Sequence, residues 1–307
     1  MNEHRFDGRV AVITGAGRGL GRSYAHLLAS KGAKIVVNDI GADLTGAGSD
    51  QGPAEEVARE IRELGGEAVA TTESVATPAG GKAIIQTALD TFGGIDILIH
   101  NAGNVRHGSL ADLTQEDFDA VIDVHLRGAF HVLRPAYPAM CKAGYGRIVL
   151  TGSIGGLYSL AKSLPYAVAK SGLIGMNNAV ALDGADKGVR CNIILPGAMT
   201  RMGGLLDTEK FPPCGPELVA PVVAYLAHES CSITGEMLVS MAGRVARALV
   251  AETEGIYRPS WTSEEVAEHL DEIRDTEKLW LLAPVPSGFS EHMGRSFEMA
   301  RKGAAEA

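Results

Sequence analysis

The stretch Thr14-Gly15-Ala16-Gly17-Arg18-Gly19-Leu20-Gly21 decides the fold of this 307-residue chain. It directly follows the apolar run from Val10 to Thr14, which predicts a buried strand, and it opens a helical pattern. In this context Gly15 permits a tight turn, Gly19 lets the backbone approach a pyrophosphate, and Gly21 lets helix and strand pack closely. Because the start of a helix also offers free N–H groups to anions, we predict a dinucleotide-binding loop here.

Six further β-branched or apolar runs follow along the chain and alternate with helical patterns. Strict alternation of strands and helices implies a parallel sheet that is covered on both faces. We therefore predict an α/β protein with a doubly wound, Rossmann-type parallel sheet of about seven strands. The strands are expected at 10–14, 34–38, 68–72, 95–99, 147–151, 189–195 and 237–239, and the main helices at 20–30, 54–64, 81–92, 118–142 and 166–185.

The domain organisation follows from the last expected strand, which ends near Gly243. Residues 1–243 are predicted to form one dinucleotide-binding domain. Residues 244–307 carry helical patterns at 244–254 and 263–275 without a strand signal, and are predicted to be a helical extension of the same domain. The glycine-rich segment 41–52 is long for a strand-to-helix connection, so it is a candidate functional lip.

Composition favours a protein that acts on small molecules. With 46% hydrophobic and 21% charged residues the chain has the balance of an ordinary globular protein. A net charge of −9 argues against nucleic acid or an anionic membrane as partner. The polar start of the sequence and the absence of a long apolar stretch predict neither a signal peptide nor a membrane span, and a cytoplasmic location is expected.

The metal-binding residue types show no metal-ligand spacing. The four cysteines lie too far apart for a C-x-x-C pair, which fits a reducing compartment. The nine histidines form no H-E-x-x-H pattern. We predict no metal site, and a metal hydrolase is disfavoured.

Asp39 ends the second expected strand, 18 residues beyond Gly21. A carboxylate at this place accepts hydrogen bonds from ribose hydroxyls and repels a 2′-phosphate. NAD is therefore favoured over NADP, although Arg18 beside the phosphate loop is the kind of residue that serves a 2′-phosphate.

Tyr166 and Lys170 are separated by one helical turn, so phenol and ammonium project from the same helix face. A nearby cation favours the phenolate and makes tyrosine a usable general base. Ser153 follows the expected strand 147–151 at the carboxyl edge, where a hydroxyl can hold a substrate oxygen.

Together these motifs resemble the short-chain dehydrogenase/reductase family over residues 8–243. The resemblance implies that Ser153 positions the substrate, Tyr166 is the acid/base, and Lys170 grips the nicotinamide ribose. A non-catalytic NAD-binding regulator is disfavoured, since Tyr166 and Lys170 are both present. The implied cofactor-binding residues are Gly15, Arg18, Gly19, Leu20, Gly21, Asp39, Ser74, Val75, Asn101, Ala102, Gly103, Tyr166, Lys170, Pro196, Gly197, Met199 and Thr200.

One position departs from the family pattern. In Val124-His125-Leu126-Arg127-Gly128 a histidine stands where the family usually has asparagine. We favour a packed, structural role for His125; the alternative is a proton relay that uses its backbone carbonyl.

Further stretches, including Val37-Asn38-Asp39 and His228-Glu229-Ser230-Cys231, resemble the (3R)-hydroxyacyl-CoA dehydrogenase group within the family. This resemblance implies NAD-dependent oxidation of a 3-hydroxyacyl-CoA, with a steroid-like acyl group as an option. The alternatives are a 17β-hydroxysteroid dehydrogenase and a reductase of 3-oxoacyl thioesters or other ketones. A homodimer or homotetramer built on the two long helices is also implied.

Overall fold

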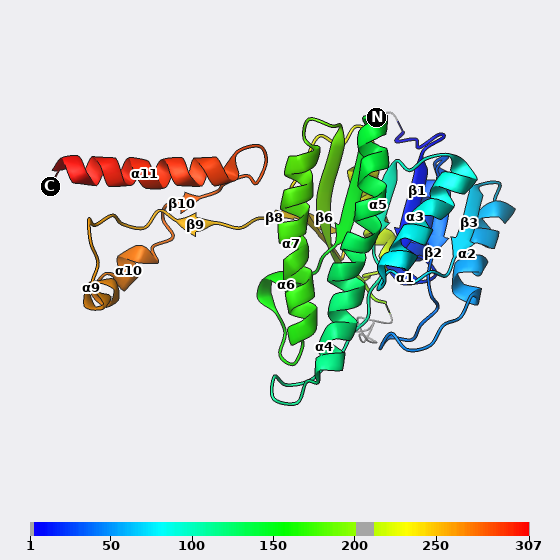
Figure 1. Ribbon diagram of the computed structural model, residues 1–307, viewed down its shortest axis with the longest axis horizontal. Coiled ribbons are helices and arrows are strands. Elements are labelled where there is room, and N and C mark those ends of the chain that lie inside the picture. The colour runs from blue at the N-terminus through cyan, green and yellow to red at the C-terminus, as the bar shows by residue number, and fades with distance from the viewer. Residues whose placement is uncertain (1–2, 201–211, 307) are drawn as a thin grey trace. The chain divides into compact units, whose positions relative to one another are not determined.

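An eight-stranded sheet forms the centre of the protein, with strand order β3-β2-β1-β4-β5-β6-β7-β8. The computed structural model describes residues 3–200 and 212–306 (Figure 1). The prediction of a doubly wound sheet is confirmed, with one strand more than expected. The strands are β1 (Val10–Thr14), β2 (Lys34–Asn38), β3 (Glu67–Thr71), β4 (Ile97–His100), β5 (Gly146–Thr151), β6 (Val189–Gly197), β7 (Met237–Met241) and β8 (Arg244–Ala248).

The order in which strands are added to the sheet reverses between β1 and β4. The chain first adds β2 and β3 on one side of β1 and then places β4 on its other side. Strand β1 pairs in parallel with β2 on one side and with β4 on the other, with Thr14 opposite Asn38 and His100. The strands β5, β6 and β7 continue the parallel sheet. In open α/β sheets the crevice at such a switch point, outside the carboxyl ends of the strands, is where ligands bind.

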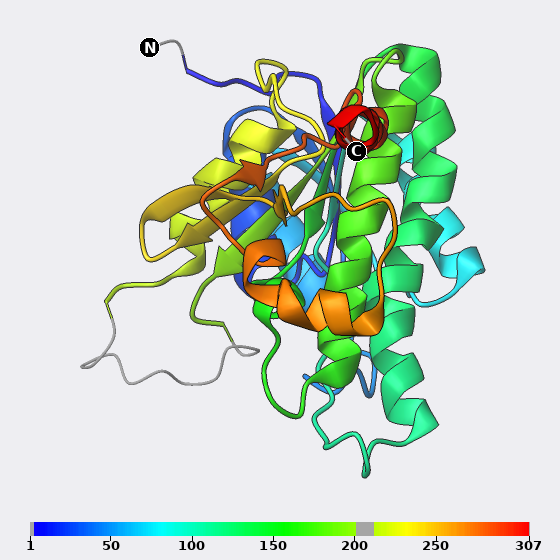
Figure 2. The ribbon, with the colours of Figure 1, turned by 90° about the vertical axis from the view of Figure 1, so that its left-hand side faces the viewer.

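Helices cover both faces of the sheet (Figure 2). The buried side chains of α1, α2 and α8 share one apolar cluster with strands β1 and β2, and α3, α5 and α7 cover the opposite face. The helical segments are α1 (Gly19–Ser30), α2 (Gly52–Glu63), α3 (Pro78–Phe92), α4 (Gln115–Ile122), η1 (Asp123–Arg127), α5 (Gly128–Ala143), α6 (Gly155–Tyr158), α7 (Leu164–Gly184), η3 (Pro216–Leu218) and α8 (Ala220–Ala227).

Local sequence signals fix several helix ends. The Thr77 side chain accepts the N–H of Gly80 at the start of α3, and Gly93 ends that helix at φ 80°. Thr114 caps α4 by accepting the N–H of Asp117. Threonine caps and a left-handed glycine satisfy backbone groups that a helix end leaves free.

The single long helix expected at 118–142 is divided by the π-helical turn η1. Within this turn the backbone carbonyl of His125 accepts a hydrogen bond from His100 Nε2 at 3.2 Å. A carbonyl with a partner outside its own helix accommodates the wider π spacing, and such bulges are frequent at functional sites.

The prediction of a helix at 244–254 is wrong. Strand β8 occupies residues 244–248 instead, and two residues with positive φ, Ala242 (48°) and Gly243 (82°), connect it to β7. A two-residue turn with both φ values positive is a hairpin turn, so β8 runs antiparallel to β7. The alternating pattern of Val245 and Ala246 with arginines fits a strand as well as a helix, and the turn decides between them.

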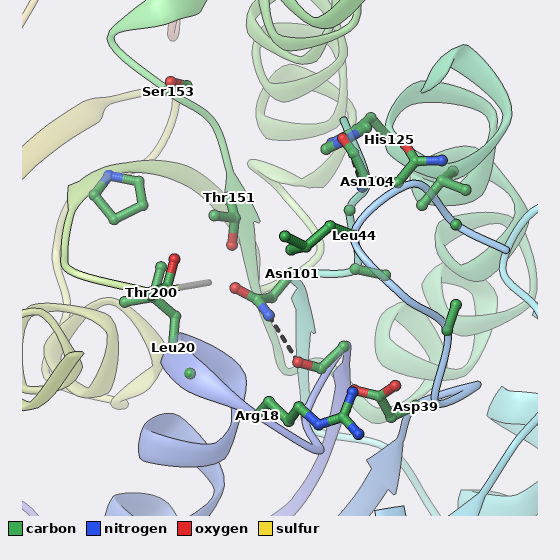
Figure 3. A pocket seen from close by; sticks show the side chains of 18 of the residues that line it. Arg18, Leu20, Asp39, Leu44, Asn101, Asn104, His125, Thr151, Ser153 and Thr200 are labelled. Carbon is green, nitrogen blue, oxygen red and sulfur yellow. Dashed lines mark hydrogen bonds between the residues drawn. The ribbon is translucent and has the colours of Figure 1, made fainter. Parts of the chain in front are cut away.

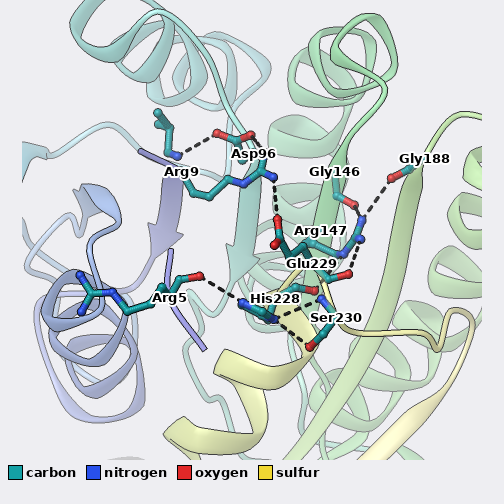
Figure 4. Close-up of polar contacts among 10 residues, drawn as sticks. Arg5, Arg9, Asp96, Gly146, Arg147, Gly188, His228, Glu229 and Ser230 are labelled. Carbon is teal, nitrogen blue, oxygen red and sulfur yellow. Dashed lines mark hydrogen bonds and ion pairs between the residues drawn. The ribbon is translucent and has the colours of Figure 1, made fainter. Parts of the chain in front are cut away.

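Buried polar contacts tie the amino end of the sheet together (Figure 4). Arg147, which is 5% exposed, donates to the backbone carbonyls of Gly146, Gly188, His228 and Glu229 at 2.8 to 3.3 Å. These carbonyls belong to the start of β5, to the turn before β6 and to the turn after α8. One guanidinium therefore holds the end of the sheet that lies opposite the carboxyl edge.

The chain divides into two compact units, Met1–Arg247 and Ala248–Ala307. The second unit contains β9 (Glu252–Thr253), α9 (Ser263–Glu268), α10 (Leu270–Ile273), β10 (Leu279–Trp280) and α11 (Gly288–Glu306). Strands β9 and β10 pair antiparallel, so the expectation that this part contains no strand is wrong. The expected helix start near Ser263 is present, with Thr262 and Glu265 forming a capping box.

Candidate active site

A cleft of about 520 Å³ opens at the carboxyl ends of β1, β2, β4, β5 and β6 (Figure 3). Arg18 and Asp39 lie at one end of it and Ser153 at the other. Most of the predicted site residues line this cleft: Gly15, Arg18, Gly19, Leu20, Asp39, Ser74, Val75, Asn101, Ala102, Gly103, Ser153, Tyr166, Lys170, Pro196, Gly197 and Thr200.

Two predicted residues lie beside the cleft and do not line it. Gly21 packs beneath the phosphate loop, where an added Cβ would stand 2.2 Å from the carbonyl oxygen of Gly15. The backbone N–H of Met199 donates to the carbonyl of Cys214 at 2.5 Å. Both residues therefore support neighbours that do face the cleft.

The glycine loop has the geometry of a phosphate cradle. Gly15 and Gly19 have φ values of 64° and 54°, and a Cβ on Gly15 would lie 2.8 Å from Cα of Ala102. Arg18 precedes α1 without a capping side chain, and the first turn of α1 carries no acidic residue. The N–H groups at the start of α1 are thus open to an anion.

Asp39 braces the loop from the end of β2. Its Oδ2 accepts the N–H of Gly17 at 2.9 Å, and its Oδ1 accepts the N–H of Gly41 at 2.8 Å. The carboxylate fixes the phosphate loop and the start of the glycine-rich segment while it lines the cleft.

The glycine-rich segment forms a wall of the cleft through Ala42, Asp43, Leu44 and Gly46, together with Ile40 just before it. The carbonyl of Leu44 accepts the N–H of Val105 at 3.0 Å, and Asp43 Oδ1 accepts the N–H groups of Thr45 and Ala47. These bonds hold the segment in one conformation over the cleft. The unusual length of this segment indicated a functional role in the sequence, but it did not identify the individual residues that line the cleft.

The opposite end of the cleft brings Ser153, Tyr166 and Lys170 together. The Ser153 hydroxyl and the Tyr166 ring both lie close to Gly155. A Cβ added to Gly155 would stand 3.3 Å from Ser153 Oγ and 3.5 Å from Tyr166 Cε1. Lys170 is 4% exposed, its Nζ donates to the carbonyl of Thr151 at 2.5 Å, and it lies 5.6 Å from the centre of the Tyr166 ring. Lysine and tyrosine therefore share a site without a direct hydrogen bond.

Burial sets the protonation of these groups. It lowers the pKa of Lys170 to about 7 and raises that of Tyr166, while a hydrogen bond with the Ser153 hydroxyl acts to lower the tyrosine pKa. Without further positive charge the phenol keeps its proton at neutral pH. Tyr166 can act as a base only when added positive charge in the cleft stabilises the phenolate.

Several cleft residues were absent from the sequence-based set. Besides the glycine-rich wall they are Asn38, Asn104, Val124, His125, Thr151, Gly152, Ala198, Cys214 and Met241. Most follow a predicted strand or flank a motif residue, so their position at the carboxyl edge was the main available signal; His125 was also marked by its departure from the family pattern.

Across the described ranges 3–200 and 212–306, no group of three or more His, Cys, Asp or Glu side chains is placed to hold a metal ion. In the same ranges no helix is long and apolar enough to cross a membrane.

The sequence matches the family model for short chain dehydrogenases over residues 9–208. It is 45% identical over 271 residues to peroxisomal multifunctional enzyme type 2 of Drosophila melanogaster, an alignment that covers 88% of this chain and 45% of that protein. It is 44% identical over 248 residues to a short-chain type dehydrogenase/reductase of Mycobacterium tuberculosis, covering 80% of this chain and 87% of that protein.

Among solved structures, full-length peroxisomal multifunctional enzyme type 2 from Drosophila melanogaster has a TM-score of 0.82 and 39% identity. The match covers 97% of this chain and 50% of that chain. The chain thus spans about half the length of the Drosophila multifunctional enzyme, and most of the length of the mycobacterial relative.

Proposed function

The chain belongs to the short chain dehydrogenase family, and we propose that it is an NAD-dependent oxidoreductase that oxidises the hydroxyl group of (3R)-3-hydroxyacyl-CoA to a ketone. The juxtaposition of Ser153, Tyr166 and Lys170 in the same cleft as the glycine loop and Asp39 carries this proposal. Catalysis is assigned to residues 1–243, with 244–307 as an extension.

The residues at the phosphate end fit NAD. The open N–H groups of α1 and the cradle at Gly15 and Gly19 suit a pyrophosphate, and the Asp39 carboxylate suits an unphosphorylated ribose. When bound, NAD supplies a ring that accepts a hydride and adds positive charge to the cleft. That charge is the stabilisation that the phenolate of Tyr166 needs.

Three side chains, those of Ser153, Tyr166 and Lys170, have different roles toward the substrate. Ser153 holds the substrate hydroxyl oxygen, and Tyr166 removes its proton as the carbon–hydrogen bond breaks. Lys170 stays anchored to the carbonyl of Thr151, where its charge favours the tyrosinate. Oxidation thus releases one proton to the protein for each alcohol converted.

Apolar residues directly after Ser153 support a substrate with an acyl or steroid-like body. Ile154, Tyr158 and Leu160 are 40%, 83% and 71% exposed, which is unusual for large apolar side chains beside a site. The segment that follows Leu160 is linked to the loop after β4, because the N–H of Gly108 donates to the carbonyl of Lys162 at 3.0 Å.

Basic residues near this rim suit the phosphates of coenzyme A. Lys162 lies on the loop after α6, and Arg106 and His107 lie on the loop after β4, where Arg106 pairs with Asp117 at 3.7 Å. Arg201, a fourth candidate from the sequence, lies outside the described residues.

The decisive experiment follows NADH formation with (3R)- and (3S)-3-hydroxyacyl-CoA of several chain lengths, beside a 17β-hydroxysteroid and cyclohexanol. We expect turnover of the (3R) thioesters only. Tyr166→Phe should abolish turnover and keep most of the NADH binding, since it removes the reactive hydroxyl and keeps the aromatic ring that lines the cleft.

Other outcomes select the alternatives. Turnover confined to the steroid favours a 17β-hydroxysteroid dehydrogenase, and reduction of a 3-oxoacyl-CoA with no detectable oxidation favours a reductase. Turnover of cyclohexanol alone discards the acyl-CoA assignment and leaves the alcohol chemistry in place.

Self-association is a further part of the proposal. Helices α5 and α7 expose Phe130, Leu182 and Val168 on the outside of the sheet's helical cover. Large apolar side chains at this exposure suit a contact between copies of the chain, as a homodimer or homotetramer. A cytoplasmic location stays a prediction.

A further inference from the structure

The glycine-rich segment after β2 forms a closed loop at the cleft. Its two ends touch at the base, where the N–H of Asp50 donates to the carbonyl of Ile40 at 2.9 Å and the carbonyl of Asp50 leaves no room for a Cβ on Gly41. We call residues 42–48, which lie between these ends, the strap. The strap therefore leaves the end of β2 and returns close to its own start.

The tip of the strap is bonded to the loop after β4. The carbonyl of Leu44 accepts the N–H of Val105 at 3.0 Å, and a Cβ added to Gly46 would stand 2.7 Å from Asn104 Nδ2. Because β1 lies between β2 and β4 in the sheet, the strap passes over the carboxyl end of β1, where the glycine loop begins. It thus spans the crevice at the switch point of the sheet.

The strap lies across the path between the two ends of the cleft. Asp39 lines one end and Ser153 the other, and Leu44 stands between them in the view of Figure 3. Leu44 is half-buried and lines the cleft, so its apolar side chain loses further contact with water when a ligand fills the cleft. A cofactor that joins the two ends therefore lies beneath the strap.

The strap is built to move as one piece. Asp43 Oδ1 accepts hydrogen bonds from the N–H groups of Thr45 and Ala47 and from the Thr45 hydroxyl, at 2.7 to 3.0 Å, which stiffens the tip. Gly41 and Gly48 have φ values of 71° and 79°, and among the described residues no atom lies within 4 Å of a Cβ built on Gly48. A stiff tip between two glycines, bonded across the cleft by a backbone hydrogen bond, is able to open and close as a unit.

We propose that the strap closes over bound NAD(H), with Leu44 packed against the cofactor, and that its release from Val105 limits the rate at which the cofactor leaves. The inference rests on the proposed use of NAD and goes beyond it by assigning cofactor retention to residues 42–48. A closed strap blocks entry as well as exit, so a change that holds it shut slows both rates.

The test locks the strap with a disulfide. A Cβ on Gly46 would stand 3.5 Å from Cβ of Asn104, which is within the disulfide range, so Gly46→Cys/Asn104→Cys carries a reducible link. When the double variant is loaded with NADH and then oxidised, NADH chased with excess NAD should dissociate at least about tenfold more slowly than from the same protein after reduction, in stopped-flow fluorescence. Both states share the strain of a side chain at φ 86°, so their difference reports the link alone. Wild type given the same oxidation is the control and should keep its dissociation rate.

A second variant tests the contact without a cysteine. In Leu44→Ala we expect NADH to dissociate at least about fivefold faster, with an association rate within about twofold of the wild-type rate. Leu110→Ala is the matched control, since Leu110 is 78% exposed on the loop after β4, outside the lining of the cleft, and it should change neither rate.

Two results would overturn the inference: equal NADH dissociation from the oxidised and reduced double variant, and unchanged dissociation from Leu44→Ala. Failure of the disulfide to form at this spacing also counts against the position given to the strap. If wild type binds no NADH, the proposed cofactor use fails and the inference fails with it. If (3R)-3-hydroxyacyl-CoA is not turned over while the disulfide still slows NADH release, the substrate assignment alone is refuted.

Discussion

The hydroxyl of Thr14 donates a hydrogen bond to Nδ1 of His100 across 3.1 Å, joining the ends of β1 and β4 beneath the cleft. The direction of this bond is fixed by its surroundings, because Thr14 Oγ1 already accepts the N–H groups of Asn101 and Ala102 at 3.0 and 3.1 Å. His100 must therefore carry its proton on Nε2, which donates to the carbonyl of His125. The loop after β4 and the π-helical turn are held by one neutral imidazole.

This neutral imidazole predicts a loss of stability in acid. Burial lowers the pKa of His100 from 6.5 to about 3, so the unfolded chain binds the proton first. The contribution of His100 to the free energy of unfolding is complete above the unfolded pKa, and falls by about 1.4 kcal/mol for each pH unit between that value and the folded pKa. We expect the difference in unfolding free energy between wild type and His100→Gln to shrink by about 2 kcal/mol from about pH 7 to about pH 5, measured by urea denaturation. A difference independent of pH contradicts the assigned neutral state.

Substitution of Gly21 should disable the phosphate loop. A Cβ in Gly21→Ala would overlap the carbonyl of Gly15 at 2.2 Å, so the loop must shift and NADH affinity should fall by about a hundredfold or more in a fluorescence titration. Gly294→Ala is the matched control, since that glycine lies exposed within α11 with nothing near its Cβ. The control should keep its affinity and gain up to about 1 kcal/mol in unfolding free energy.

Loss of the Asp39 carboxylate should relax the cofactor preference. In Asp39→Ala we expect NADPH to bind at least about fivefold more tightly than in the wild type, because the repulsion of a 2′-phosphate is removed. NADH should bind more weakly, since the N–H groups of Gly17 and Gly41 lose their acceptor. Asp90→Asn removes an equal charge from the exposed face of α3 and should change neither affinity. Equal binding of both cofactors by the wild type refutes the role given to Asp39.

The buried guanidinium of Arg147 should be hard to replace. Lysine has fewer donors and no planar fork, so Arg147→Lys leaves some of the four carbonyls unsatisfied, at a cost of about 3 kcal/mol in unfolding free energy. Arg59→Lys on the surface of α2 changes an exposed ion pair with Glu63 and should cost less than about 1 kcal/mol. Chemical denaturation of both variants checks this. Equal losses of unfolding free energy in the two variants would contradict the stabilising role given to the buried guanidinium.

A charge placed on α5 should break the proposed association. Phe130 is 54% exposed, and Phe130→Glu is expected to shift the light-scattering mass toward 32.1 kDa, the mass of one chain. Leu64→Glu alters an 81% exposed leucine after α2, on the other helical layer, and should leave the mass unchanged. A wild-type mass of one chain at micromolar concentration is the result that refutes self-association.

The sequence was sufficient for the sheet and for the place of the site, because both follow from local patterns. A glycine loop between strand and helix, and a serine directly after β5, come to one edge once the strands are parallel. The positions of Gly15, Ser153 and Tyr166 around a single cleft follow from that rule.

The parts that sequence reasoning missed depend on distant partners. Helical periodicity over 118–142 cannot show that the carbonyl of His125 accepts a hydrogen bond from His100, so the π-helical turn could not be predicted from the sequence. The wall formed by Leu44 depends on its bond to Val105, 61 residues away. Strand β8 was mistaken for a helix because only the turn at Ala242 and Gly243 distinguishes the two.

The central place of β1 in the sheet has a consequence for how the chain folds. When synthesis has passed β3, strands β1, β2 and β3 are able to pair, but the other edge of β1 has no partner until β4 is made. An unpaired strand edge with four apolar residues in five favours association with other chains, and pairing across a long loop is slow. The half-sheet formed by the first seventy residues is therefore the species most exposed to aggregation, and the arrival of residues 97–100 removes that exposure.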